Sequence, residues 1–131
     1  MSGWFARPVL FVTDIHRSVD FYVNQLGFVQ AWLYDEEGKA YVAQVERPGC
    51  ALILSSQWPD KLGRGLIFIS LDVDVLHALR SEYEQRGVDV KDGWWGYKLM
   101  VIRDLDGNEL YFNYPNPPDT QAPEIQAVNT A

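Results

Sequence analysis

Two stretches of this chain repeat one plan: an apolar strand, an aspartate, a helix with one apolar face, then a glycine and a second apolar run. The first stretch has Asp14 before its helix and Gly27 after it. The second has Asp74 and Gly87 at the corresponding places, sixty residues further along. Such a repeat predicts two equivalent modules, because each helix must bury its apolar face against a sheet.

Local signals extend each stretch to a β-α-β-β-β unit. Asp14 and Asp74 are expected to cap the two helices, since an aspartate side chain accepts a hydrogen bond from a first-turn N–H. Gly27 is expected to stop the first helix in the left-handed conformation. Apolar runs between turn residues predict the strands, at residues 8–13, 28–34, 40–46 and 50–55 in the first module and 66–72, 88–91, 97–103 and 108–113 in the second.

The length of 131 residues fits one domain. We expect that domain over residues 1–118, with modules at about 7–58 and 64–114 and the linker between the halves at 56–65. Beyond Tyr114 the chain holds several prolines and few large apolar residues. Residues 119–131 are therefore predicted to form a loose C-terminal tail.

Composition narrows the compartment and the partners. No run approaches the length of a membrane span and no signal peptide is evident, so the expected location is the cytoplasm, away from membranes. The single Cys50 fits a reducing compartment and is expected to be a buried small side chain. The net charge of −7 disfavours nucleic acid, which needs a basic face. It is compatible with a cationic small molecule, although acidity also serves solubility alone.

Aromatic side chains make up 14% of the chain, a high share for a domain of this size, and some of them are expected in the core. Trp58, Trp94 and Trp95 stand beside proline, aspartate and glycine, in contexts that indicate loops. Large aromatics on loops offer flat stacking area and lose little rotamer entropy on binding. These three tryptophans are therefore candidate ligand-binding residues.

Two motifs carry a family resemblance. The first is Val-x-Asp-x-x-x-Ser-x-x-Phe-Tyr at residues 12–22, followed by Leu-Gly-Phe at 26–28, and the second is Asp-x-Asp-Gly-Asn at 104–108. Together they resemble the vicinal oxygen chelate superfamily, which holds glyoxalases, dioxygenases and bleomycin-resistance proteins, over residues 7–114. The resemblance implies an α+β fold in which two tandem βαβββ modules form a half-barrel cup.

The enzymes of that superfamily hold a divalent metal through His and Glu on the cup strands. Carried over by position, those ligands fall on Arg7, on Tyr111 and within residues 51–55 and 66–68, where neither His nor Glu stands. The resemblance with these departures implies no catalytic residue, no metal and no cofactor. Glu109 lies on the same strand face as Tyr111 by alternation. Arg7 is expected to pair with a buried carboxylate such as Glu109, with contact to an anionic ligand as the alternative. The histidines, His16 and His77, fall in the predicted helices and are expected on their surfaces.

Within the superfamily the sequence resembles the bleomycin-resistance type most, through Trp95-Gly96 before the last hairpin and Arg-Asp-x-x-Gly-Asn after it. Leu105 replaces the proline that is usual in that type, and Lys98 replaces a common arginine. The resemblance implies a homodimer that sequesters a drug without altering it. The ligand-binding residues expected from position or loop context, each with a packing role as the alternative, are Trp32, Tyr41, Ser55, Trp58, Trp94, Trp95, Gly96 and Tyr111.

Three functions therefore compete. The leading hypothesis is a metal-free protein that confers resistance by sequestering a bleomycin-like or other flat aromatic antibiotic. A metal-dependent glyoxalase, dioxygenase or epimerase is the first alternative, disfavoured by the missing ligands. A binder of an unrelated aromatic metabolite is the second, and sequence cannot separate it from the first hypothesis because aromatic stacking tolerates many ligands.

Overall fold

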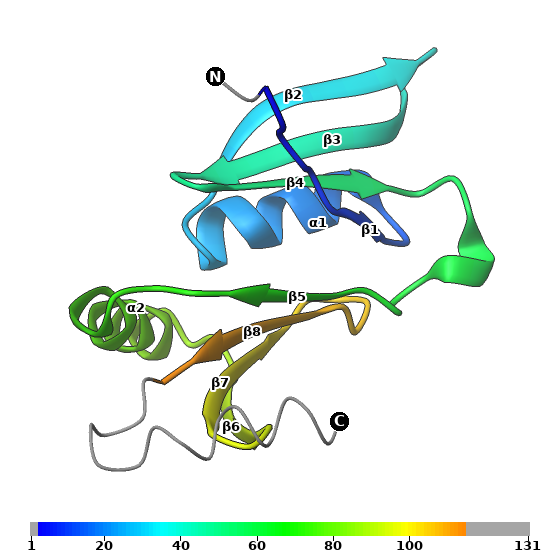
Figure 1. Cartoon of the computed structure of the whole chain (residues 1–131). Helices are drawn as coiled ribbons and strands as arrows, with labels where there is room; N and C mark the ends of the chain where they lie inside the picture. Colours follow the sequence, from blue (N-terminus) through cyan, green and yellow to red (C-terminus); the bar gives the residue numbers. More distant parts are fainter. Residues whose placement is uncertain (1–2, 115–131) are drawn as a thin grey trace. The chain divides into compact units, whose positions relative to one another are not determined.

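A computed structural model describes residues 3–114 of the chain (Figure 1). The first module contains β1 (Val9–Phe11), α1 (Ile15–Asp20), the π-helical turn η1 (Phe21–Gln25), β2 (Val29–Glu36), β3 (Lys39–Arg47) and β4 (Cys50–Ser55). A short 3-10 helix η2 (Pro59–Lys61) follows. The second module contains β5 (Leu66–Ile69), α2 (Val73–Gln85), β6 (Val90–Trp94), β7 (Lys98–Arg103) and β8 (Glu109–Asn113). The predicted tail at 119–131 lies outside the described residues.

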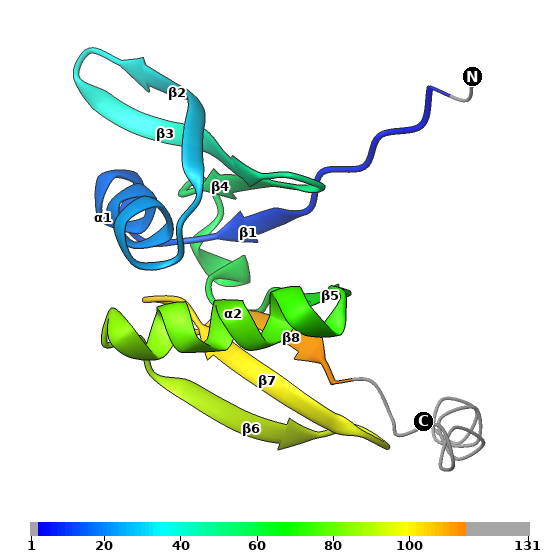
Figure 2. The same ribbon diagram turned by 90° about the vertical axis from the view of Figure 1, so that its left-hand side faces the viewer.

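Each module builds its own four-stranded sheet, and the two sheets have equivalent strand orders. The strand orders are β1-β4-β3-β2 and β5-β8-β7-β6, so each module brings its first strand next to its last. In the first sheet β1 runs parallel to β4, whereas β4–β3 and β3–β2 are antiparallel (Figure 2). This arrangement confirms the predicted α+β fold of two βαβββ modules.

The described chain divides into two compact units. Of the described residues, one unit holds 3–66 with Arg103–Glu109, and the other holds Ile67–Ile102 with 110–114. The β7–β8 turn therefore belongs to the same unit as the first sheet. Among residues 3–114 there is no helix with the length and apolarity needed to cross a membrane.

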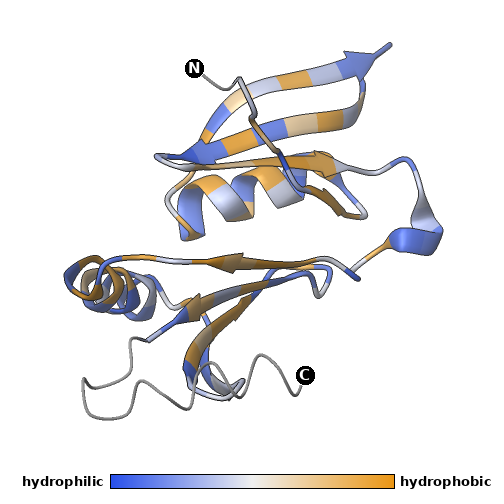
Figure 3. Ribbon diagram, in the orientation of Figure 1, coloured by the Kyte–Doolittle hydropathy of each residue, from blue (hydrophilic) through white to orange (hydrophobic). Residues whose placement is uncertain are grey.

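The first helix begins where the sequence predicts. The Asp14 side chain accepts a hydrogen bond from the Arg17 backbone N–H at 3.1 Å, which confirms its role as the cap. Ile15, Val19 and Leu26 are buried with the strand residues Leu52 and Leu54. Alternation along β2 and β3 leaves polar residues between the apolar ones, visible as alternating bands in Figure 3.

The second helix begins earlier than predicted, and the assignment of Asp74 as its cap is wrong. The helix starts at Val73, with Asp72 in the cap position and the Leu76 N–H bonded to the Asp72 carbonyl. The sequence Asp-Val-Asp offers two candidate caps, and β5 ends at Ile69 rather than residue 72, so the chain turns early. Asp74 instead lies in the first helical turn, where its charge favours the positive end of the helix dipole.

The Asp-x-Asp-Gly-Asn motif organises the β7–β8 turn within the first unit. The buried Asp104 carboxylate accepts hydrogen bonds from the Tyr22 hydroxyl at 2.9 Å, from the Asn108 side chain at 3.0 Å, and from two backbone N–H groups of the turn. Asn108 in turn donates to the Phe11 carbonyl and accepts from the Gly65 N–H. Burial, and then the charge of Asp104, raise the pKa of the Tyr22 hydroxyl well above its usual value, which keeps this donor protonated. The family motif is thus a structural clamp.

Gly63 should be essential to this clamp, and we expect Gly63→Ala to destabilise the fold by about 2–4 kcal/mol. Its φ is +69°, and an added Cβ would meet the Asp106 backbone carbonyl. Gly38→Ala is the matched control, because Gly38 has φ +85° but no atom near the added Cβ. That variant should lose only about 1 kcal/mol. Chemical denaturation of both variants checks this, and equal losses would contradict the steric argument.

Candidate functional site

The first sheet has one face covered by α1 and one free of helix. The residues that β3 and β4 bury against α1 alternate with Val42, Gln44, Ile53 and Ser55. In the strand register Gln44 lies opposite both Trp32 and Ile53, and Val42 lies opposite Ser55, so these residues share the helix-free face. Two predicted ligand-binding residues, Trp32 and Ser55, therefore project from the same side.

Gln44 sits at the centre of this face, and its buried amide holds three neighbours. Its Oε1 accepts from Arg7 Nη1 at 2.9 Å and from Trp32 Nε1 at 3.1 Å, while its Nε2 donates to Glu46 at 2.6 Å. These bonds orient the Trp32 ring, which keeps 39% of its surface exposed. The predicted pairing of Arg7 with Glu109 is wrong. Arg7 bonds the Gln44 amide, and the Glu109 carboxylate pairs with Arg103 at 2.7 Å, because these two residues stand beside the turn that joins β7 to β8.

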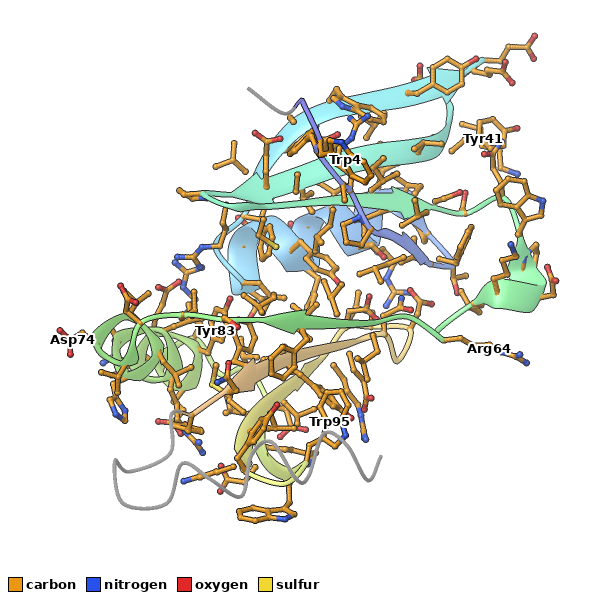
Figure 4. The ribbon with its side chains drawn as sticks, in the orientation of Figure 1. Trp4, Tyr41, Arg64, Asp74, Tyr83 and Trp95 are labelled. Atoms are coloured by element: carbon orange, nitrogen blue, oxygen red, sulfur yellow. The ribbon has the colours of Figure 1, made fainter. Side chains whose placement is uncertain are left out.

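The other candidates of the first sheet lie at different places. Tyr41 alternates with Val42 and so lies on the helix-covered side of β3, where Lys39 approaches its ring; Figure 4 labels it near the start of that strand. Ser55 is buried, and its hydroxyl accepts from the Gln57 N–H at 3.3 Å. Trp58 packs edge-on against Phe11 at 5.8 Å. Since Phe11 pairs with Ser55, Trp58 borders the helix-free face, whereas Tyr41 does not.

The second sheet has an equivalent helix-free face. Arg80 of α2 bonds Asp92 at 2.8 Å, so Asp92 and its partner in β7, Met100, point toward the helix. Gly93 and its partner Leu99 therefore point the other way. Leu99 is almost fully buried although α2, the helix of its own unit, lies on the other side of the sheet, so other side chains cover this face.

An aromatic cluster, defined as Phe68, Trp95, Tyr97 and Tyr111, lies over the second sheet. Trp95 stands edge-to-face to Phe68 at 5.6 Å and to Tyr111 at 6.0 Å, and Phe68 meets Tyr97 at 6.4 Å. Gly96, at φ +76°, makes the turn that returns the Trp95 N–H to the Tyr97 carbonyl. Trp95 still exposes 46% of its surface, and Phe68 is also exposed. Figure 4 labels Trp95 in this position. The cluster can thus offer ring surface to a ligand.

Two members of this cluster were missed from the sequence. The sequence places Phe68 within residues 66–68, at a position that a metal ligand holds in the family's enzymes, and it gives no signal that singles out Tyr97. The alternation of Leu66 and Phe68 with less exposed residues along β5 could have indicated Phe68. Tyr97 follows the Trp95-Gly96 turn directly, and a turn of this kind places the residues on its two sides together.

Trp94 differs from its neighbour. The predicted loop around it is wrong, because β6 continues to Trp94, which pairs with Lys98 of β7. In this register Trp94 shares the side of Asp92 and Met100, the helix side. It is 77% exposed, and no ring contact of Trp94 occurs within residues 3–114. The structure therefore separates Trp94 from the aromatic cluster.

One buried polar atom on the second sheet lacks a partner. The Oδ1 of Asn113 has no hydrogen bond within the described residues. Asn113 alternates with Phe112, which is buried, and lies on the same face of β8 as Tyr111. Buried acceptors are nearly always bonded in native proteins, so this atom calls for an explanation.

Metal-binding side chains do not gather in the described part of the chain. Over residues 3–114 there is no group of three His, Cys, Asp or Glu side chains that could hold an ion. Arg7 is engaged with Gln44 and Tyr111 with Trp95. Cys50 is half-buried, against the expectation of full burial, because it is the first residue of β4, directly after the turn from β3. Burial raises the pKa of its thiol, and nearby Arg47 lowers it in part.

Comparisons with known proteins agree with this geometry. Residues 4–112 match the family described as the Glyoxalase/Bleomycin resistance protein/Dioxygenase superfamily. No curated protein matches the sequence.

Solved structures give a more detailed likeness. An antibiotic-binding protein, TnmS3, from Streptomyces sp. CB03234 is 26% identical, with a TM-score of 0.67 over 88% of this chain and 99% of that one. A glyoxalase/bleomycin resistance protein from the same organism is 25% identical, with a TM-score of 0.61 over 83% and 100%. A bleomycin-binding protein from Streptomyces verticillus, complexed with copper(II)-bleomycin, is 24% identical, with a TM-score of 0.67 over 88% and 100%.

Proposed function

Because this chain belongs to the glyoxalase/bleomycin resistance protein/dioxygenase superfamily, we propose that it binds a flat aromatic antibiotic and sequesters it without altering it. The observation that carries the proposal is the aromatic cluster on the second sheet, centred on the half-exposed Trp95. Antibiotic binding by TnmS3, at 26% identity, supports the class of ligand.

The geometry of the cluster suits stacking. Phe68 and Tyr111 both meet Trp95 edge-to-face, which holds the indole in place while leaving part of its surface open. A ring that lies on such a surface gains about 1–3 kcal/mol per stacked aromatic. Trp32, held by Gln44, gives the first sheet a stacking residue of its own.

The proposal makes the protein a binder rather than an enzyme. The superfamily also holds dioxygenases, which act through a metal. Here the positions that the family resemblance assigns to metal ligands carry the guanidinium of Arg7 and the phenol of Tyr111, in place of imidazole and carboxylate. A guanidinium repels a cation, and a divalent site needs about three converging ligands.

A titration tests this function directly. We expect flat aromatic antibiotics, bleomycin among them, to quench tryptophan fluorescence saturably, with the same affinity in the presence of EDTA. The antibiotic recovered afterwards should have an unchanged mass. A chemically altered antibiotic, or binding lost with EDTA, would favour the metal-dependent enzyme. Saturable binding of aromatic metabolites alone would favour the second alternative.

The homodimer, the single domain over residues 1–118 and the cytoplasmic location stay predictions. Sedimentation equilibrium at micromolar concentration would check the homodimer, and a monomer would count against it.

A further inference from the structure

Asn113, in β8 of the second sheet, has a side-chain oxygen that accepts no hydrogen bond from the described residues. Its Oδ1 is buried and has no hydrogen bond within residues 3–114. An unpaired buried acceptor lowers the stability of the fold, because the atom loses water and gains no replacement. The other described side-chain oxygens and nitrogens buried to the same degree are bonded. Such an exception is expected where a bound water or a ligand supplies the missing donor.

The position of Asn113 connects it to the aromatic cluster. The Tyr114 N–H bonds the Lys98 carbonyl at 3.0 Å, so in the antiparallel register Asn113 lies opposite Leu99. Tyr111, two residues earlier in β8, lies on the same face and contacts Trp95. The acceptor and the stacking rings therefore lie on the same face of one sheet. Because Oδ1 is buried, a ligand donor reaches it only when the side chains that cover it move aside.

We propose that Asn113 Oδ1 accepts a hydrogen bond from an N–H or O–H group on the ligand that stacks on Trp95. The ligand class is then narrower than any flat aromatic: it is a planar ring system with a donor at the ring edge. This inference rests on the proposed function. In it, Asn113 recognises the donor group of the ligand, and Trp95 stacks on the ligand ring. A site that bonds a donor discriminates strongly against an analogue lacking it.

The test is a double-mutant cycle between protein and ligand. At alkaline pH, where its pyridine nitrogen is unprotonated, norharmane is a flat tricyclic with one ring N–H. It is compared with its 9-methyl derivative, which has no ring N–H. Wild-type protein should bind norharmane about tenfold more tightly, the worth of one hydrogen bond. In Asn113→Leu this preference should disappear. Asn113→Asp keeps an acceptor and removes the amide donor, so it should retain the preference.

Ligand-free controls keep the result interpretable. Asn113→Leu should melt no lower than wild type, since the acceptor that it removes has no bond to lose. A lower melting temperature would show that Asn113 serves the fold and would overturn the inference. So would an Asn113→Leu variant that keeps the preference for norharmane, or that weakens both compounds alike.

The two proposals fail differently. If neither compound binds at millimolar concentration and no antibiotic quenches the tryptophan fluorescence, the aromatic binding function fails and the inference falls with it. If an antibiotic binds and norharmane does not, the inference alone is wrong. If both compounds bind equally and Trp95→Ala weakens both, the function stands and the role of Asn113 is wrong.

Discussion

Trp95→Ala should weaken binding of the aromatic ligand roughly tenfold to a hundredfold, whereas Trp94→Ala should leave the affinity unchanged. The two residues are the same type and adjacent in the chain, so the comparison holds composition and local sequence constant. Trp95 meets Phe68 and Tyr111 on the helix-free face, and Trp94 points to the helix side. Loss of a stacked aromatic typically removes about 1–3 kcal/mol of binding, which corresponds to that range of affinity.

Paired measurements separate binding from folding. Isothermal calorimetry gives the affinity of each variant, and thermal denaturation gives its stability. Both tryptophans are well exposed, so neither variant should lose the roughly 3–5 kcal/mol expected for a core tryptophan. A large drop in melting temperature of Trp95→Ala with unchanged affinity would show that the cluster packs the fold and that the ligand binds elsewhere.

The architecture was predictable because it depends on periodicity. Alternation and the repeated strand-helix-strand plan predicted both β-α-β-β-β units, and Asp14 caps its helix as expected. The second helix shows the limit of the pattern. Two aspartates stand two residues apart at its start, and the choice between them depends on where β5 ends, which is decided by pairing rather than by the local sequence.

The candidate site was predictable in part for the same reason. Trp32 and Ser55 share a face because their strands pair in register. Tyr41, one residue out of that alternation, lies on the opposite side. Trp94 and Trp95 have similar sequence contexts. They differ because β6 ends at Trp94, which keeps Trp94 on the helix side of the sheet and leaves Trp95 in the turn that follows. The partners of Arg7 and Glu109 were beyond prediction, since a long side chain selects its partner from three-dimensional neighbours.

The second large effect is expected for replacement of Asp104. Because this residue belongs to the family motif, the motif alone could suggest that it lies in the ligand-binding site. Its buried carboxylate accepts four hydrogen bonds within the first unit, and two of the donors are the side chains of Tyr22 and Asn108. Because Asn108 also bonds Phe11 and Gly65, the carboxylate supports the whole β7–β8 turn. A role in the clamp predicts loss of stability, whereas a role in binding predicts loss of affinity.

We expect Asp104→Ala to lower the free energy of unfolding by about 3–5 kcal/mol, since several buried donors lose their acceptor together. Asp106→Ala is the matched control two residues away: its carboxylate bonds Thr13 through the backbone N–H at 3.2 Å and the hydroxyl at 2.6 Å, in exposed surroundings. That variant should lose about 1 kcal/mol, the worth of exposed hydrogen bonds. Urea denaturation measures both losses, and ligand titration at low temperature, where Asp104→Ala is still folded, measures the affinity. If Asp104→Ala is as stable as wild type but no longer binds the ligand, this carboxylate belongs to the ligand site. The four hydrogen bonds predict the opposite result, a large loss of stability with intact affinity.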